Sequence, residues 1–161
     1  MGKRKSMLCL MTASIMAIGY RWKYKKNGRE IAALKSVNDK LSDNCQLLNH
    51  WLELKHENKS LATYFRDLGY KRIAIYGMAE LANRLMEELE GSGISVIYGI
   101  DRDAGCSISR ISDVYSPQMA KLPDADAIVV TPYYALEAIR EKLKNKVECP
   151  IISIEEVIWS V

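Results

Sequence analysis

The residues best placed to do chemistry lie in a glycine turn and at an acidic residue further along the chain. The segment Gly77–Ala82 reads GMAELA and follows a short apolar run, Arg72–Tyr76. Gly77 permits a tight turn from strand to helix, and Ala82 is small enough to let the helix and strand approach. Asp101 follows a second apolar run, where a carboxylate can accept a hydrogen bond from a ribose 2′-hydroxyl. This spacing indicates a nucleotide-binding crevice.

Two residues of the turn differ from the dinucleotide fingerprint GxGxxG/A. Ala79 stands where a second glycine would let the backbone contact a pyrophosphate. Glu80 brings negative charge to the first turn of a helix, which suits the helix dipole but repels phosphate. The turn therefore indicates the fold more specifically than it indicates NAD(P) as the ligand, and the cofactor stays unknown, with NAD(P) and a nucleotide-sugar both open.

From residue 71 onward, short apolar runs alternate with amphipathic segments, which predicts strands alternating with helices. The expected strands are 72–76, 94–100, 125–131 and 150–154, and the expected helices are 80–90 and 133–146. Residues 102–123 are less regular, with one candidate short strand around 112–115. We expect an α/β domain with a small doubly wound, Rossmann-like parallel sheet in the strand order 2-1-3-4. Its crevice would lie at the carboxyl ends of the first and third strands.

Four segments of this body carry a resemblance to a known group: IAIYGMAELANRLMEEL, VIYGIDRD, DADAIVVTP and CPIISIEEVI. Together they resemble the short Rossmann-like domains, often nucleotide-sugar-binding or CoA-binding-like, that are attached to or encoded near bacterial surface-polysaccharide enzymes. The resemblance covers roughly residues 60–158. It implies a role accessory to cell-envelope polysaccharide biosynthesis. It also implies a set of lining residues: Gly77, Met78, Ala79 and Glu80 at the nucleotide end, Asp101 and Arg102 at the ribose, and Thr131 and Pro132 on the opposite wall.

No catalytic signature accompanies this crevice. No tyrosine is followed by a lysine four residues later, as a short-chain reductase or epimerase requires, and neither a GxSxG elbow nor a GxxxxGK[ST] loop is present. The histidines and the four cysteines complete no zinc spacing, and the pair Asp101 and Asp103 is a weak metal candidate. Cys106 and the tyrosines Tyr133 and Tyr134 could approach a ligand. The chain is thus more simply a binding module than an enzyme; the alternatives are a non-catalytic adaptor and an NAD-dependent, nucleotide-sugar-modifying enzyme that needs a partner subunit.

Composition and charge exclude several classes of protein. At 161 residues, with 48% hydrophobic and 27% charged residues, the chain fits one folded domain with an appendage and excludes collagen, low-complexity disorder and a multi-pass membrane protein. Residues 1–29 hold eight of the 23 basic residues and none of the 20 acidic residues. The remainder is therefore acidic, and we expect no nucleic-acid partner.

The basic N-terminal segment, 1–29, contains the uncharged run Met7–Tyr20. Its flanking lysines, arginines and aromatic residues predict a transmembrane helix that anchors the chain and keeps the α/β domain, 58–161, in the cytoplasm. A cleaved signal peptide and an ordinary helix are the alternatives.

A helix is expected over 30–57, between the N-terminal segment and the α/β domain. Its apolar residues follow heptad spacing: Ile31, Leu34, Asn38, Leu41, Cys45, Leu48 and Leu52. Asn38 falls at an a position, where a buried asparagine can fix a parallel two-stranded register. One interpretation is a short coiled coil that forms a homodimer or recruits a partner enzyme through 31–52. The other is an amphipathic helix that packs on its own domain, a role that Leu47, Trp51 and Leu54 would suit.

Overall fold

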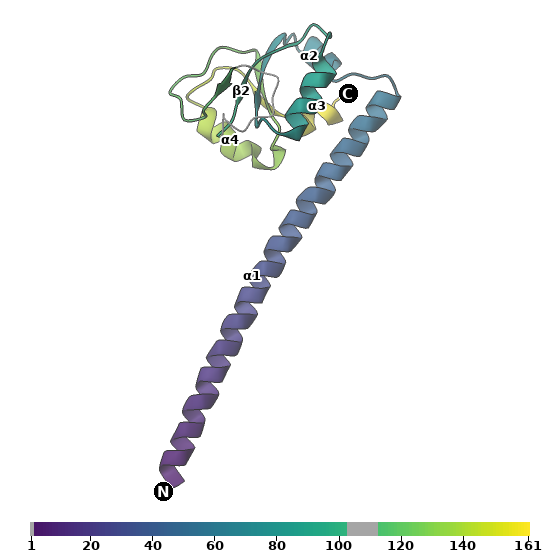
Figure 1. Ribbon diagram of the computed structural model, residues 1–161. Helices are drawn as coiled ribbons and strands as arrows, with labels where there is room; N and C mark the ends of the chain where they lie inside the picture. The colour runs from purple at the N-terminus through teal and green to yellow at the C-terminus, as the bar shows by residue number, and fades with distance from the viewer. Residues whose placement is uncertain (1, 103–112) are drawn as a thin grey trace. The chain divides into compact units, whose positions relative to one another are not determined.

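The computed structural model describes residues 2–102 and 113–161, with residues 2–21 and 24 described by their backbone alone. The chain begins with one long helix, α1 (Gly2–His56), and continues into an α/β domain (Figure 1). It divides into two compact units, Met1–Cys45 and Gln46–Val161, so the last turns of α1 belong to the same unit as the sheet.

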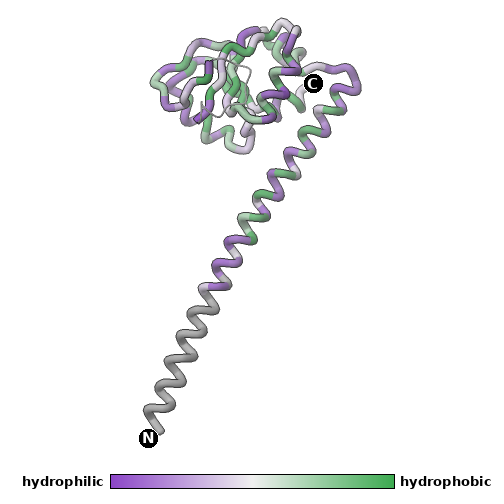
Figure 2. Tube along the Cα trace, in the orientation of Figure 1, coloured by the Kyte–Doolittle hydropathy of each residue, from purple (hydrophilic) through white to green (hydrophobic). Residues whose placement is uncertain are grey.

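The expected membrane anchor is wrong. Within the part of the chain that the structure describes, no helix has the length and apolar character needed to cross a membrane. The uncharged run Met7–Tyr20 covers only about 21 Å of helix at about 1.5 Å per residue, against a hydrocarbon core of roughly 30 Å. Further along α1, hydrophilic and hydrophobic residues alternate (Figure 2). The anchor was the reason for placing the α/β domain in the cytoplasm. Without the anchor, this placement is not supported.

The α/β domain contains one sheet of five parallel strands, which confirms the expected class. The strands are β1 (Arg72–Tyr76), β2 (Ser95–Ile100), β3 (Val114–Tyr115), β4 (Ala127–Val130) and β5 (Ile151–Ser153). Their order is β3-β2-β1-β4-β5, which differs from the expected order 2-1-3-4 by one added edge strand, while the four expected strands keep their expected order. The difference arises because the short strand β3 pairs with β2 and forms an additional edge.

Helices cover both faces of this sheet. One face packs against the end of α1, α2 (Ala62–Asp67), α3 (Glu80–Leu89) and α5 (Ile154–Trp159). The other face packs against α4 (Leu136–Leu143), which follows a 3-10 turn at Tyr133–Ala135. Strand β1 lies at the centre and is buried on both faces from Ile73 to Tyr76. This arrangement explains why the strand sequences are nearly continuous apolar runs.

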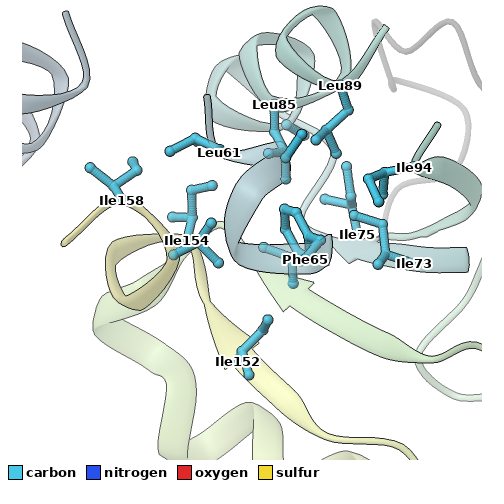
Figure 3. Packing of buried hydrophobic residues seen from close by; sticks show 14 of the residues in the cluster. Leu61, Phe65, Ile73, Ile75, Leu85, Leu89, Ile94, Ile152, Ile154 and Ile158 are labelled. Atoms are coloured by element: carbon cyan, nitrogen blue, oxygen red, sulfur yellow. The ribbon is translucent and has the colours of Figure 1, made fainter. Parts of the chain in front are cut away.

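Phe65 of α2 lies within the core of the first face and is fully buried. Figure 3 shows it beside Ile73 and Ile75 of β1, with Leu85 and Leu89 of α3 nearby. Isoleucines of β5 and α5 complete the same cluster. Since each fully buried side chain of this size contributes roughly 1.5–3 kcal/mol, this cluster is a main source of the domain's stability.

The end of α1 packs on this domain through three buried side chains, Leu47, Trp51 and Leu54. Nearby, Lys55 forms an ion pair with Glu88 of α3, whose side chain is only 3% exposed. The Leu61 N–H also donates to Glu88 Oε1 at 3.3 Å. The buried carboxylate is therefore paired and hydrogen-bonded, as a charge removed from water must be.

A second carboxylate, Asp126, fixes the amino end of β1. Its Oδ2 accepts hydrogen bonds from the backbone N–H groups of Lys71 and Arg72, each at 2.7 Å. These hydrogen bonds hold the pKa of Asp126 below its ordinary value of 3.8. A carboxylate whose pKa is lowered by folding stabilises the fold above its unfolded-state pKa, and this stabilisation is lost as the pH falls through its folded-state pKa.

We expect Asp126→Asn to reduce the free energy of unfolding at pH 6, since the charge-assisted hydrogen bonds become neutral. The deficit relative to the wild type should shrink as the pH falls below about 3.8, the ordinary value, because the wild-type carboxyl then becomes neutral too. Urea unfolding followed by circular dichroism at a series of pH values measures this. Asp124→Asn, at an exposed neighbouring position, is the control and should show no such pH-dependent deficit. A deficit for Asp126→Asn that stays constant down to pH 2 would contradict this account.

Candidate functional site

The sequence-predicted site residues lie at the carboxyl edge of the sheet, where β1 is flanked by β2 and β4. The chain passes from β1 through α3 to β2 on one side, and β4 lies on the other side. Such a switch point is where open parallel sheets form ligand crevices. Backbone hydrogen bonds join the three strand ends: the Gly77 N–H donates to Ile100 O at 2.8 Å, and the Thr131 N–H donates to Tyr76 O at 3.0 Å.

Gly77 adopts a backbone conformation that requires glycine. Its φ is +90°, in the left-handed region. A Cβ at this position would lie 2.7 Å from Pro132 Cδ and 2.8 Å from Thr131 Oγ1, both too close. Thr131 and Pro132, the expected opposite wall, are therefore in direct contact with the turn.

Thr131 holds this turn with its side chain as well as its backbone. It is buried, and its hydroxyl donates to Gly77 O at 2.7 Å and lies 3.2 Å from Tyr76 O. The hydroxyl hydrogen is thus directed to the Gly77 carbonyl, while Tyr76 O accepts the Thr131 backbone N–H. Its place in the site is to position the turn.

Asp101 holds the same turn from the side of β2. Its Oδ2 accepts a hydrogen bond from the backbone N–H of Met78 at 2.8 Å. The Met78 side chain is buried, and its Sδ would lie 2.6 Å from a Cβ built on Gly99 of β2. Met78 can therefore contribute its backbone, and not its side chain, to a ligand site.

The amino end of α3 begins at this turn without a side-chain cap. Ala79 occupies the N-cap in an extended conformation and has no oxygen to accept a first-turn N–H. Helix α5 differs, because its N-cap Ser153 accepts a hydrogen bond from the Glu156 N–H at 2.9 Å. The exposed start of α3 therefore directs backbone donors and the positive end of its dipole toward the site.

The charge of Glu80 is balanced within α3. Arg84 donates to Glu80 Oε1 at 2.6 Å and to Glu87 Oε2 at 2.6 Å. The hydrogen bond with Glu80 is the largest of several effects that raise the pKa of Arg84. This pairing moderates the repulsion of phosphate that we expected from Glu80.

Tyr76 is a site residue that the sequence reasoning missed. It ends β1 and is buried on the α4 face of the sheet. Its pKa is raised overall. Burial is the largest cause, the nearby Arg102 guanidinium opposes it, and the Asp101 carboxylate adds to it. The alternation of side chains along a strand offered a signal, since it places Tyr76 on the opposite face from Ile75. Arg102 itself is exposed.

Of the other candidates, Tyr133 and Tyr134 follow Pro132 directly in the 3-10 turn, with Tyr133 packed against the core of the first face and Tyr134 exposed. A cavity of about 760 Å³ lies between residues 120–125 and 144–149. These segments precede β4 and β5, so the cavity lies at the amino edge of the sheet, away from Gly77. Among the described residues, no group of three or more His, Cys, Asp or Glu side chains could hold a metal ion. Asp103 and Cys106 lie outside the described residues.

Comparison with models of protein families, with curated proteins and with solved structures found no match to this chain.

We expect Gly77→Ala to destabilise the domain by about 2 kcal/mol or more, from positive-φ strain and the contact with Pro132. Gly93→Ala is a matched control, because Gly93 also has a positive φ, +85°, but has nothing within 4 Å of an added Cβ. It carries only the conformational strain, about 1 kcal/mol. Chemical unfolding of both variants measures the difference. Equal losses would show that the contact of Gly77 with Thr131 and Pro132 contributes nothing.

Proposed function

We propose that the α/β domain binds a nucleotide or nucleotide-sugar at the carboxyl edge of its sheet. The observation that carries this proposal is the pair of side chains, Asp101 and Thr131, that hold the Gly77–Met78 turn from the two neighbouring strands. They fix the uncapped amino end of α3 at the switch point of a parallel sheet. A phosphate group is the ligand chemistry that such a helix end favours.

The strand order supports a Rossmann-like classification. The order β3-β2-β1-β4-β5 equals that of the first five strands of the dinucleotide-binding fold, in which the ligand lies across the ends of the first and fourth strands. Gly77 occupies the position of the first fingerprint glycine. The resemblance to domains associated with surface-polysaccharide enzymes supports a sugar-bearing nucleotide and an accessory role in cell-envelope polysaccharide biosynthesis.

The proposal assigns parts of the ligand to particular residues. The phosphates would contact the backbone of Ala79 and Glu80 at the start of α3. A ribose hydroxyl would donate to Asp101, because an ionised carboxylate has about four acceptor sites and can serve both Met78 and a ligand. The exposed Arg102, which follows Asp101 directly, would add a positive charge at the ribose end of the ligand.

Paired substitutions at Ala79 test this proposal without relying on loss of the fold. Ala79→Asp supplies the missing N-cap, so it should stabilise α3 by about 1 kcal/mol. It also places a negative charge where the phosphate would bind, so binding should fall at least tenfold. Ala79→Gly should tighten binding, since the backbone can then approach a pyrophosphate more closely.

Thermal-shift measurements and calorimetry on the full chain would compare NAD, NADP, CoA and UDP-, GDP- and CMP-sugars. A ligand at 100 times its Kd should stabilise the wild type by about 2.7 kcal/mol. Ala79→Asp should be more stable without ligand and should gain much less from it. Absence of stabilisation by any of these compounds, or equal stabilisation of the wild type and Ala79→Asp, would refute binding at the start of α3.

A further inference from the structure

A row of large apolar side chains on α1 is exposed, although its residues follow a heptad repeat. The exposed fractions are 66% for Ile31, 69% for Leu34, 58% for Leu41, 39% for Leu48 and 62% for Leu52. Asn38 and Cys45, the remaining heptad positions, are exposed as well. We call these seven residues the heptad face. Exposed apolar surface of this extent marks an interaction site.

This face is different from the one that packs on the α/β domain. Over the last turns of α1, the domain buries Leu47, Trp51 and Leu54, whereas Leu48 and Leu52 stay exposed. At 3.6 residues per turn, the two sets are centred roughly 110° apart around the helix. Intramolecular packing therefore accounts for the first set and leaves the heptad face unexplained.

We propose that the heptad face pairs with the same face of a second copy, forming a parallel two-stranded coiled coil over 31–52. Apolar a and d positions at alternating spacings of three and four residues are the pattern of such a seam. In a parallel, in-register pair, Asn38 lies opposite Asn38 of the second copy. The two amides can then hydrogen-bond to each other, which selects two strands and this register.

Glu30 and Lys35 flank the apolar seam, and their charges favour the same parallel, in-register pair. With Ile31 and Asn38 at a positions, Glu30 falls at g and Lys35 at e. In a parallel coiled coil, a g residue faces the e residue five positions later on the other helix. Glu30 of each copy therefore faces Lys35 of the other. Both side chains are exposed, and the structure records no ion pair for either one within the described chain.

This complementarity favours a second copy over an unrelated partner. Asn38, the apolar a and d residues, and the charges of Glu30 and Lys35 are each matched by residues of an identical chain. A two-fold axis uses each of them twice, as in other isologous interfaces. The proposal does not depend on nucleotide binding, and the two can fail separately.

Sedimentation velocity of the full chain at tens of micromolar measures the assembly. We expect twice the chain mass of 18.3 kDa, and a monomer for the double variant Leu34→Asp, Leu41→Asp. Ser36→Asp, which lies at an f position facing away from the seam, is the control and should remain a dimer. A wild-type monomer at these concentrations, or a trimer or tetramer, would overturn the proposal.

Charge exchange tests the pairing across the helices. Glu30→Lys and Lys35→Glu should each raise the dimer Kd roughly three- to thirty-fold at low salt, since each creates like-charge pairs twice per dimer. The double variant restores opposite charges and should return to within about threefold of the wild-type Kd. Failure of the double variant to recover would refute this register.

Crosslinking at Cys45 tests the orientation. Cys45 is a free, exposed thiol at an a position, so in a parallel pair it lies opposite its own copy. A chain that retains only Cys45, with its other cysteines changed to serine, should form a covalent dimer with a short bismaleimide. The matched chain that retains only Cys149 should not. A dimer that does not crosslink through Cys45 would be antiparallel and would exclude the proposed pairing.

Discussion

The close contact of Gly77 with Thr131 and Pro132 is the constraint on which the organisation of the α/β domain depends. Because residue 77 has no side chain, the end of β1 can turn into α3 while β4 lies directly against it. This proximity lets the Thr131 hydroxyl reach Gly77 O, and it leaves the Met78 N–H directed toward Asp101 on the other side. The start of α3 is thereby fixed relative to three strand ends. A larger residue at position 77 would separate these groups, so the stability of the domain and the geometry of the site have one origin.

Carboxylates act at both ends of the central strand. Asp126, which directly precedes β4, accepts the Lys71 and Arg72 N–H groups at the amino end of β1. Asp101 accepts the Met78 N–H just beyond the carboxyl end of β1. Charge-assisted hydrogen bonds of this kind are stronger than neutral ones. They satisfy backbone groups that the ladder itself cannot pair. The result is a central strand whose two boundaries are both defined, which gives a ligand site a fixed backbone on which to form.

The sequence predicted the parallel α/β class because buried strands read as continuous apolar runs and because Gly77 and Asp101 end two of them. The five-strand order differs from the expected one because β3 has only two residues, Val114–Tyr115, and is a strand only through its pairing with β2. The sequence marked it as no more than a candidate short strand around 112–115. The hydrogen bond to Asp101 and the contact with Pro132 also lay beyond sequence reasoning, since the reach of a side chain depends on tertiary packing. The membrane anchor was wrong because its uncharged run, Met7–Tyr20, is too short to cross a membrane, and this length can be read from the sequence itself.

Helix α1 carries two apolar sets that serve different surfaces. The set that the sequence indicated for packing on the α/β domain is the one that packs there. The domain takes Leu47, Trp51 and Leu54, because α2, α3 and α5 contribute to the same cluster. Lys55 and the buried Glu88 then tie the end of α1 to α3, the helix that follows the Gly77 turn. A change in α1 at this end would therefore act on the helix that presents the proposed phosphate site, while the heptad face stays available to a second copy.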